Sequence, residues 1–299
     1  MYTSNTRKKI LVPISAEKPA QGLLLLSYAG QFAAVLGAEL LLLGSSGTPA
    51  ISPAEEKNKL SQLRALGERV LGRVPEDKGY VPFSCHLQPG GLKDGVNAVV
   101  QEEGVDLVLM QAEAYPEGGR VGAADHAAVV MEQVSCPVMV VPTAQPFKRV
   151  KRLVFATDFT DQDPQVLAQI DAFAALAGAA ITLVQVYSQA ERGHIGEMEA
   201  AIPGIERQLE GRNATFRLLE EEDVLEGISR FAEREGADMV VLATQDSYLM
   251  QRLFSESYVR MRAYHTHIPL LTFRQYKSKF CAGCLTDSNS LRVGRHGPE

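Results

Sequence analysis

The chain contains one structural unit twice, and this internal repeat constrains its fold more than any other feature. Four short apolar segments of the first half recur in the same order in the second half, at offsets of 143, 141, 132 and 132 residues. The paired segments are Lys9–Ser15 with Arg152–Asp158, Gly37–Leu42 with Gly178–Leu183, Gly104–Leu109 with Gly236–Val241, and Cys136–Val140 with Ile268–Thr272. Because the last two pairs share one offset, the closing parts of the two halves align without a gap. The sequence therefore predicts two copies of one domain.

Each half is predicted to alternate strands with helices. The expected strands are short continuous apolar runs, which is typical of strands buried on both faces of a parallel sheet. Start signals mark three of the helices: a capping box from Ser52 to Glu55, the Asp163–Pro164 pair, and Asp223. The order β-α-β-α-β-α-β-α-β occurs twice. The sequence therefore predicts an α/β protein with two tandem doubly wound domains.

The domain boundaries follow from composition. We expect the first domain to cover residues 1–145 and the second to cover residues 146–275. The two prolines of Pro142–Pro146 predict a short and fairly stiff linker. Residues 276–299 are poor in apolar periodicity, so we expect them to form a flexible C-terminal tail.

Composition and charge exclude several classes of protein. The chain has 30 Lys and Arg against 36 Asp and Glu, a net charge of −6, which does not suit a protein that coats nucleic acid. Four cysteines in 299 residues are too few for a disulfide framework. The apolar stretch Leu23–Gly44 contains Gln31 and Glu39, so we expect a buried helix and strand there instead of a membrane span. The sequence thus predicts a cytoplasmic protein without a nucleic-acid or membrane partner.

Three segments resemble a known family. Leu153–Phe159, Gly236–Thr244 and Cys136–Val141 are similar to the first, fourth and closing strands of the universal stress protein family. Because the resemblance covers both halves, the chain is similar to the tandem members of that family. The resemblance implies a five-stranded parallel sheet in each domain, the adenine-nucleotide α-hydrolase-like fold. It also implies that the closing strands, Val138–Val141 and Leu270–Phe273, join the domains as an intramolecular pseudo-dimer, and it allows a homodimer.

The same resemblance implies a nucleotide site, but its motif is altered here. The nucleotide-binding branch of the family holds ATP on a glycine motif, G-x2-G-x9-G-[ST], whose backbone N–H groups approach the phosphates. The residues at the motif positions are Ala243, Asp246, Glu256 and Ser257 in the second half, and Gln111, Ala114, Ala124 and Asp125 in the first. None of the glycine positions holds glycine. A carboxylate ~4 Å from a phosphate charge costs about 4 kcal/mol at an effective dielectric of ~20. We therefore expect the usual ATP mode to be lost in both halves.

The second half nevertheless keeps the residues for a ligand site. Ligands of open α/β sheets bind at the carboxyl ends of the strands, where the strand order reverses. The resemblance assigns Asp158 to the adenosine side of the family's site and Ser257 to its last motif position, whereas the first half has Ser15 in place of Asp158. The residues expected around a ligand are Thr157, Asp158, Thr244 and Ser257, with Val186, just past the middle of the second strand, as an apolar contact.

Two further motifs each have a functional and a plain structural interpretation. Gly118, Gly119, Arg120 and Gly122 could form an anion-binding loop, or they could be a flexible connection that merely needs glycine. Cys281 and Cys284 have the spacing of a metal or redox pair, and His265 with His267 could complete a zinc site. The plain alternative is two incidental thiols in a tail, and we predict no metal.

Three functions remain in view. The leading hypothesis is a non-enzymatic cytoplasmic universal stress protein that acts in stress response through a small ligand or a protein partner, without a cofactor. The alternative is a sensor whose second domain binds an adenine nucleotide, ATP or AMP, in an altered pose. A lower alternative is a nucleotide hydrolase in which Asp246 and Glu256 hold Mg²⁺. No sequence motif of a known catalytic type supports the hydrolase.

Overall fold

A computed structural model describes residues 7–14, 19–72, 80–111, 126–142, 146–209, 212, 214–244 and 268–274. The predicted tail, residues 276–299, and the middle of the predicted linker, residues 143–145, lie outside the described residues. The domain boundaries at 145 and 275 therefore stay predictions.

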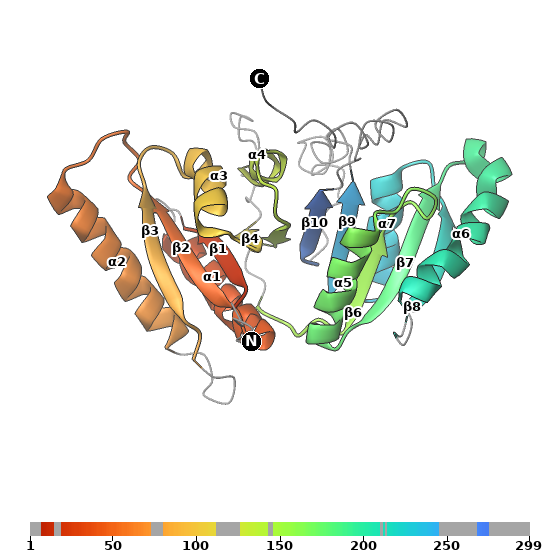
Figure 1. Cartoon of the computed structure of the whole chain (residues 1–299), viewed down its shortest axis with the longest axis horizontal. Helices are drawn as coiled ribbons and strands as arrows, with labels where there is room; N and C mark the ends of the chain where they lie inside the picture. Colours follow the sequence, from red (N-terminus) through yellow and green to blue (C-terminus); the bar gives the residue numbers. More distant parts are fainter. Residues whose placement is uncertain are drawn as a thin grey trace, which may run out of the picture.

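Helices and strands alternate in both halves (Figure 1). The first half forms β1 (Lys9–Pro13), α1 (Pro19–Leu36), β2 (Glu39–Ser45), α2 (Pro53–Leu71), β3 (Phe83–Gln88), α3 (Leu92–Glu103), β4 (Leu107–Gln111), α4 (His126–Gln133) and β5 (Val138–Val141). The second half forms β6 (Arg152–Ala156), α5 (Pro164–Ala177), β7 (Ala180–Tyr187), the 3-10 helix η2 (Gln189–His194), α6 (Ile195–Gln208), β8 (Ala214–Glu220), α7 (Val224–Arg234), β9 (Met239–Thr244) and β10 (Leu270–Arg274). The helix expected between β9 and β10 lies outside the described residues.

The predicted helix signals act as expected. At the start of α2 the Ser52 hydroxyl accepts a hydrogen bond from the Glu55 N–H, and the Glu55 carboxylate accepts one from the Ser52 N–H. The Asp163 carboxylate caps α5 by accepting from the Gln165 N–H at 2.8 Å. That helix ends at Gly178, whose φ of 66° is the left-handed conformation that glycine adopts without strain. The stretch predicted to be a buried helix and strand forms α1 and β2. No described helix combines the length and apolar character needed to cross a bilayer.

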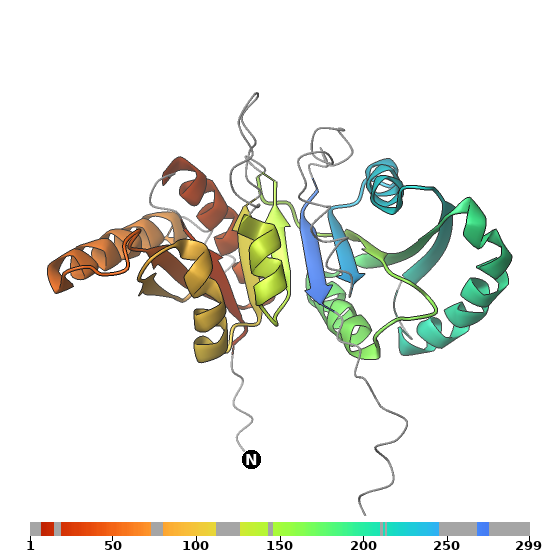
Figure 2. The same ribbon diagram turned by 90° about the horizontal axis from the view of Figure 1, so that it is seen from above.

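The strands form one sheet in the order β3-β2-β1-β4-β5-β10-β9-β6-β7-β8. Within each half all neighbouring strands are parallel, and the single antiparallel pair among the described strands joins β5 to β10. Two five-stranded parallel sheets thus continue into each other at the middle of the ten-stranded sheet, where β5 and β10 lie side by side (Figure 2). The predicted fold class and the predicted contact of the closing strands are both confirmed.

Helices cover both faces of this sheet. Buried apolar side chains of α1, α2, α5 and α6 pack on one face, and those of α3, α4 and α7 pack on the other. Each of the two core clusters contains strand residues from both halves. The apolar core is therefore continuous across the joint between the domains on both faces of the sheet.

The joint itself combines a short strand pair with a cluster of aromatic rings. Leu270, Leu271 and Thr272 of β10 lie opposite residues of β5, and the buried Thr272 hydroxyl donates to the Val138 carbonyl oxygen at 3.1 Å. On one face of the sheet the four rings of the cluster pack together, with centroid separations of 5.3 Å for Tyr28–Phe147 and 6.0 Å for Phe32–Phe173. These rings belong to α1, to the segment before β6, and to α5, so they connect the two domains. Burial raises the pKa of the Tyr28 phenol well above its usual range.

Replacing Phe32 tests how much this cluster stabilises the protein. Phe32 is 2% exposed and contacts the other three rings, so Phe32→Ala is expected to lower the free energy of unfolding by about 3–5 kcal/mol. The measurement is urea unfolding followed by circular dichroism. Leu176→Ala is the control, because this side chain of α5 is 61% exposed and its loss should change the free energy by no more than about 0.5 kcal/mol. If both variants changed the free energy of unfolding equally, the proposed contribution of the aromatic cluster to stability would be contradicted.

Candidate functional site

The strand order creates a candidate site at the carboxyl ends of β6 and β9. From β6 the chain proceeds to β7 on one side, whereas β9 and β10 lie on the other side, so the order reverses between β6 and β9. These two strands are parallel neighbours, with Ala156 opposite Leu242. Thr157 and Asp158 directly follow β6, and Thr244 is the last residue of β9. Such a reversal is where open α/β sheets bind ligands.

Asp158 organises the turn that leads from β6 to α5. One of its carboxylate oxygens, Oδ1, accepts from the Thr160 N–H at 2.8 Å and from the Thr160 hydroxyl at 2.7 Å. The Gln185 side-chain amide lies 3.4 Å from the same oxygen. The bond from the N–H two residues ahead is a local Asx turn, which fixes the direction of the carboxylate.

Gln185 is a buried polar side chain beneath this turn. It lies on β7 and is 7% exposed. Its side-chain oxygen accepts from the Phe159 N–H at 2.8 Å, while its amide nitrogen faces Asp158. Because buried backbone N–H groups need an acceptor, Gln185 stabilises the turn and orients the carboxylate above it.

Two buried polar atoms at this turn have no hydrogen-bond partner in the described part of the chain. They are the Thr157 hydroxyl oxygen and the Gln162 side-chain nitrogen, and among the described residues no other buried side-chain nitrogen or oxygen is left unsatisfied. Thr157 is 8% exposed. An unsatisfied buried polar group costs about 1–3 kcal/mol, so such groups call for a structural or functional reason. Here both atoms flank the segment that contains Asp158.

The comparisons with known proteins agree with this architecture. A model of the Universal stress protein family matches residues 6–142 and again residues 149–274. The chain belongs to the universal stress protein family. It is a tandem member, because the family unit occurs twice.

Solved structures share the fold at low sequence identity. A universal stress protein from Archaeoglobus fulgidus DSM 4304 is 14% identical, with 92% of this chain and 100% of that chain covered and a TM-score of 0.63. A protein of unknown function from Pseudomonas aeruginosa PAO1 is 18% identical over 90% of this chain and 93% of its own, with a TM-score of 0.61. The cytoplasmic domain of a prokaryotic cation chloride cotransporter is 12% identical over 89% and 95%, with a TM-score of 0.54. Comparison with curated proteins found no match.

The first domain of this universal stress protein is apolar where the second is polar. Ile14 takes the place of Thr157, since their N–H groups donate to the equivalent carbonyls of Leu43 and Val184 at 2.8 and 3.0 Å. Ile14 is 5% exposed and packs so closely on α1 that a Cβ at Gly22 would lie 3.0 Å from it. Thus the strand end of the first domain is filled by hydrocarbon.

The position of Gln185 differs between the domains in the same way. Its equivalent is Gly44, and a Cβ there would meet leucine side chains, Leu87 at 3.3 Å and Leu63 at 3.4 Å. The first domain therefore fills with leucine side chains the space that the second domain fills with an amide. Both differences make the second domain the better candidate for a polar ligand.

One predicted site residue lies elsewhere in its strand than expected. Val186 is the seventh of the eight residues of β7, so the prediction that it lies just past the middle of the strand was wrong. The strand continues because β7 keeps its register with β8 to the end, where Tyr187 pairs with Glu220. Val186 packs toward α7, since a Cβ at Gly227 would lie 3.3 Å from it.

Several predicted residues lie outside the described part of the chain, so their roles stay predictions. They are Ser257, the glycine-rich loop residues Gly118, Gly119, Arg120 and Gly122, and the residues of the weak metal motif, His265, His267, Cys281 and Cys284. Across the described ranges, His, Cys, Asp and Glu side chains form no cluster of three or more that could hold a metal ion.

The two described cysteines are half-buried thiols without a disulfide partner among the described residues. Burial raises the pKa of Cys136 to about 12, and it also raises the pKa of Cys85. A thiol reacts as a nucleophile through its thiolate form, and a raised pKa keeps that form scarce at neutral pH. Neither side chain is therefore suited to nucleophilic catalysis.

Sequence reasoning missed Gln162 and Gln185. Gln185 could have been found, because it is an amide near the end of an otherwise largely apolar strand, Ala180–Tyr187, where buried amides need partners. Gln162 has no such signal, since a glutamine in a polar turn is expected to face water.

Two substitutions separate the roles of the polar groups in the ligand-free protein. Thr157→Val removes a hydroxyl without a partner, so the free energy of unfolding should stay the same or rise by up to about 1 kcal/mol. Gln185→Leu leaves the buried Phe159 N–H without its acceptor and should lower that free energy by about 1–3 kcal/mol. Urea unfolding of dialysed protein measures both. Equal destabilisation by the two substitutions would contradict this assignment.

Proposed function

We propose that this chain is a non-enzymatic, cytoplasmic universal stress protein that acts in stress response by holding a small polar ligand at the carboxyl end of β6. The observation that carries the proposal is the pair of buried polar atoms without partners, on Thr157 and Gln162, beside the oriented carboxylate of Asp158. A ligand that supplies the missing hydrogen bonds would recover the energy that these atoms cost in the free protein.

The chemistry of the ligand follows from the free positions. The contacts from Thr160 and Gln185 all go to Oδ1 of Asp158, so among the described residues Oδ2 has no hydrogen-bond partner and can accept from a ligand. The Thr157 hydroxyl can donate or accept, and the Gln162 nitrogen requires an acceptor. We therefore expect a small molecule with hydroxyl or amino donors next to a carbonyl-like or ring-nitrogen acceptor.

Charge disfavours the family's usual triphosphate mode. The β6–α5 turn contains Asp158, Asp161 and Asp163 and no Lys or Arg, so its field repels anions. At the end of β9, Ala243 stands at the first glycine position of the motif and packs against the core. A methyl group there limits close approach of phosphate oxygens to the backbone.

No chemical step is assigned to the site. The Asp158 carboxylate and the Thr160 hydroxyl form a local turn, which gives both groups a structural role. The sensor that binds an adenine nucleotide and the nucleotide hydrolase are the two alternatives that the following experiment separates.

The first test identifies what the protein carries. The purified chain is denatured and the released small molecules are analysed by mass spectrometry, and ATP binding is measured by calorimetry with and without Mg²⁺. We expect no stoichiometric ATP or AMP and no heat of ATP binding. Near-stoichiometric adenine nucleotide would contradict the proposal in favour of the sensor, and ADP formed from ATP would favour the hydrolase.

The second test locates the site. A thermal-shift screen of small uncharged and cationic metabolites is run on the wild-type chain and on Asp158→Ala. A ligand at about 100 times its Kd adds about 2.7 kcal/mol to the free energy of unfolding, and Asp158→Ala should abolish that gain. Ser15→Ala, at the equivalent position of the first domain, is the matched control and should leave the shift unchanged. A shift that survives Asp158→Ala, or no shift with any compound, would refute the site.

A further inference from the structure

We propose that the free edge strand β3, together with the neighbouring helix α2, binds a second copy of this chain. In this dimer β3 of one copy runs antiparallel to β3 of the other across a two-fold axis, which extends the sheet. The proposal does not depend on the ligand site, which lies in the other domain.

The two free edges of the sheet differ in their protection. Among the described strands, the sheet ends at β3 on one side and at β8 on the other. Natural edge strands avoid pairing with other chains through charged side chains, proline or bulges. β8 carries Arg217 and Glu220, whereas the sequence of β3, FSCHLQ, contains no Lys, Arg, Asp, Glu or Pro. β3 is therefore the edge that is open to strand addition.

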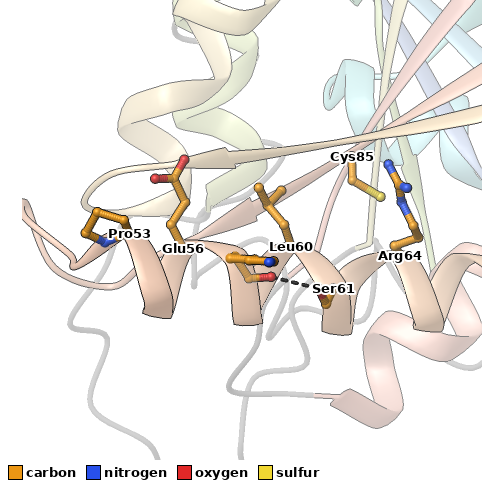
Figure 3. Close-up of a pocket in the computed structure, with 7 residues that line it drawn as sticks. Pro53, Glu56, Leu60, Ser61, Arg64 and Cys85 are labelled. Carbon is orange, nitrogen blue, oxygen red and sulfur yellow. Dashed lines mark hydrogen bonds between the residues drawn. The ribbon is translucent and has the colours of Figure 1, made fainter.

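A hollow of about 400 Å³ lies between α2 and this edge. Glu56, Leu60 and Arg64 extend from one stripe of α2 toward β3, and Cys85 of β3 contributes the opposite wall (Figure 3). The strand and the helix thus form a single concave surface with Leu60 near its centre, Glu56 and Lys57 toward the start of α2, and Arg64 toward its end.

Glu56 and Arg64 on this surface are complementary to the same two residues on a second copy of the chain. Glu56 and Arg64 are eight residues apart, which is about 12 Å along a helix. In the described part of the chain, neither side chain forms an ion pair. A two-fold axis places the start of one α2 beside the end of the other. Glu56 of each copy would then face Arg64 of the other copy, which gives two ion pairs in an isologous interface.

The joint between the two domains already has this geometry. There β5 and β10 pair in antiparallel fashion, and α1 and α5 meet on one face of the sheet through Phe32 and Phe173. The proposed dimer repeats the arrangement with β3 and α2 of two chains. Two domains of this fold can therefore join edge to edge without distortion of either sheet.

An exposed aromatic residue marks the same edge. Tyr80 lies three residues before β3 and is 81% exposed, more than any other large apolar side chain among the described residues. Tyrosine is enriched at protein interfaces because its ring buries a large area while its hydroxyl keeps a polar contact. In the antiparallel pair each Tyr80 would lie near the end of the other β3.

Sedimentation equilibrium of the full-length chain under reducing conditions tests the dimer. We expect a reversible dimer, and Ser84→Lys should raise its Kd about tenfold or more because an edge lysine opposes strand pairing. Thr215→Lys is the matched control, since Thr215 is the equivalent residue on β8, and it should leave the Kd unchanged. A Kd of about 10 µM would already populate the dimer at about 100 µM. The proposal is therefore overturned if the chain stays monomeric up to about 100 µM.

Charge reversal identifies the occupant. Glu56→Lys and Arg64→Glu should each raise the dimer Kd about tenfold or more, because each creates two like-charge contacts. The double variant restores both pairs and should return the Kd to within about threefold of wild type. Circular dichroism checks that each variant is folded. If the single reversals leave the dimer Kd unchanged, or if the double variant keeps a raised Kd, another surface or another partner is involved and this pairing is refuted.

Discussion

The antiparallel pairing of β5 with β10 is the interaction on which the rest of the structure depends. Each domain alone would be a five-stranded parallel sheet that ends in a buried apolar strand. Pairing the two closing strands satisfies the backbone groups of both edges and lets the apolar clusters continue across the joint. The aromatic cluster of Tyr28, Phe32, Phe147 and Phe173 then holds the helices of the two domains together on one face.

The duplicated scaffold carries two different strand ends. In the first domain Ile14 and the leucines around Gly44 fill the end of the sheet with hydrocarbon, which favours stability. In the second domain Thr157, Gln162 and Gln185 take up the corresponding region, and two of their polar atoms remain without partners. Since buried polar groups without partners are costly, the second domain is less stable at this point than its fold allows. Binding sites commonly have this property, because the ligand supplies the missing interactions.

Much of the fold could be predicted from the sequence. The repeat offsets indicate two copies of one unit. The capping box at Ser52 and the Asp163–Pro164 pair act on neighbouring residues, so they indicate directly where helices begin. The contact of the closing strands followed from the family resemblance. The polar turn could not be predicted, because the partner of Phe159 N–H is Gln185, 26 residues away, and only the fold brings them together. The edge surface at β3 could not be predicted from the sequence either, because the order of the strands in space decides which strand lies at an edge.

Fusing the two domains into one chain has a consequence for how they can change. In a symmetric homodimer every substitution occurs in both subunits, so a costly polar group enters both sites at once. A tandem chain breaks that symmetry: Thr157 and Ile14 occupy equivalent positions but belong to separate codons. One half can therefore retain a tightly packed, stabilising core while the other accumulates buried polar groups without partners. Because the apolar clusters continue across the joint, the packing of the first half also stabilises the second.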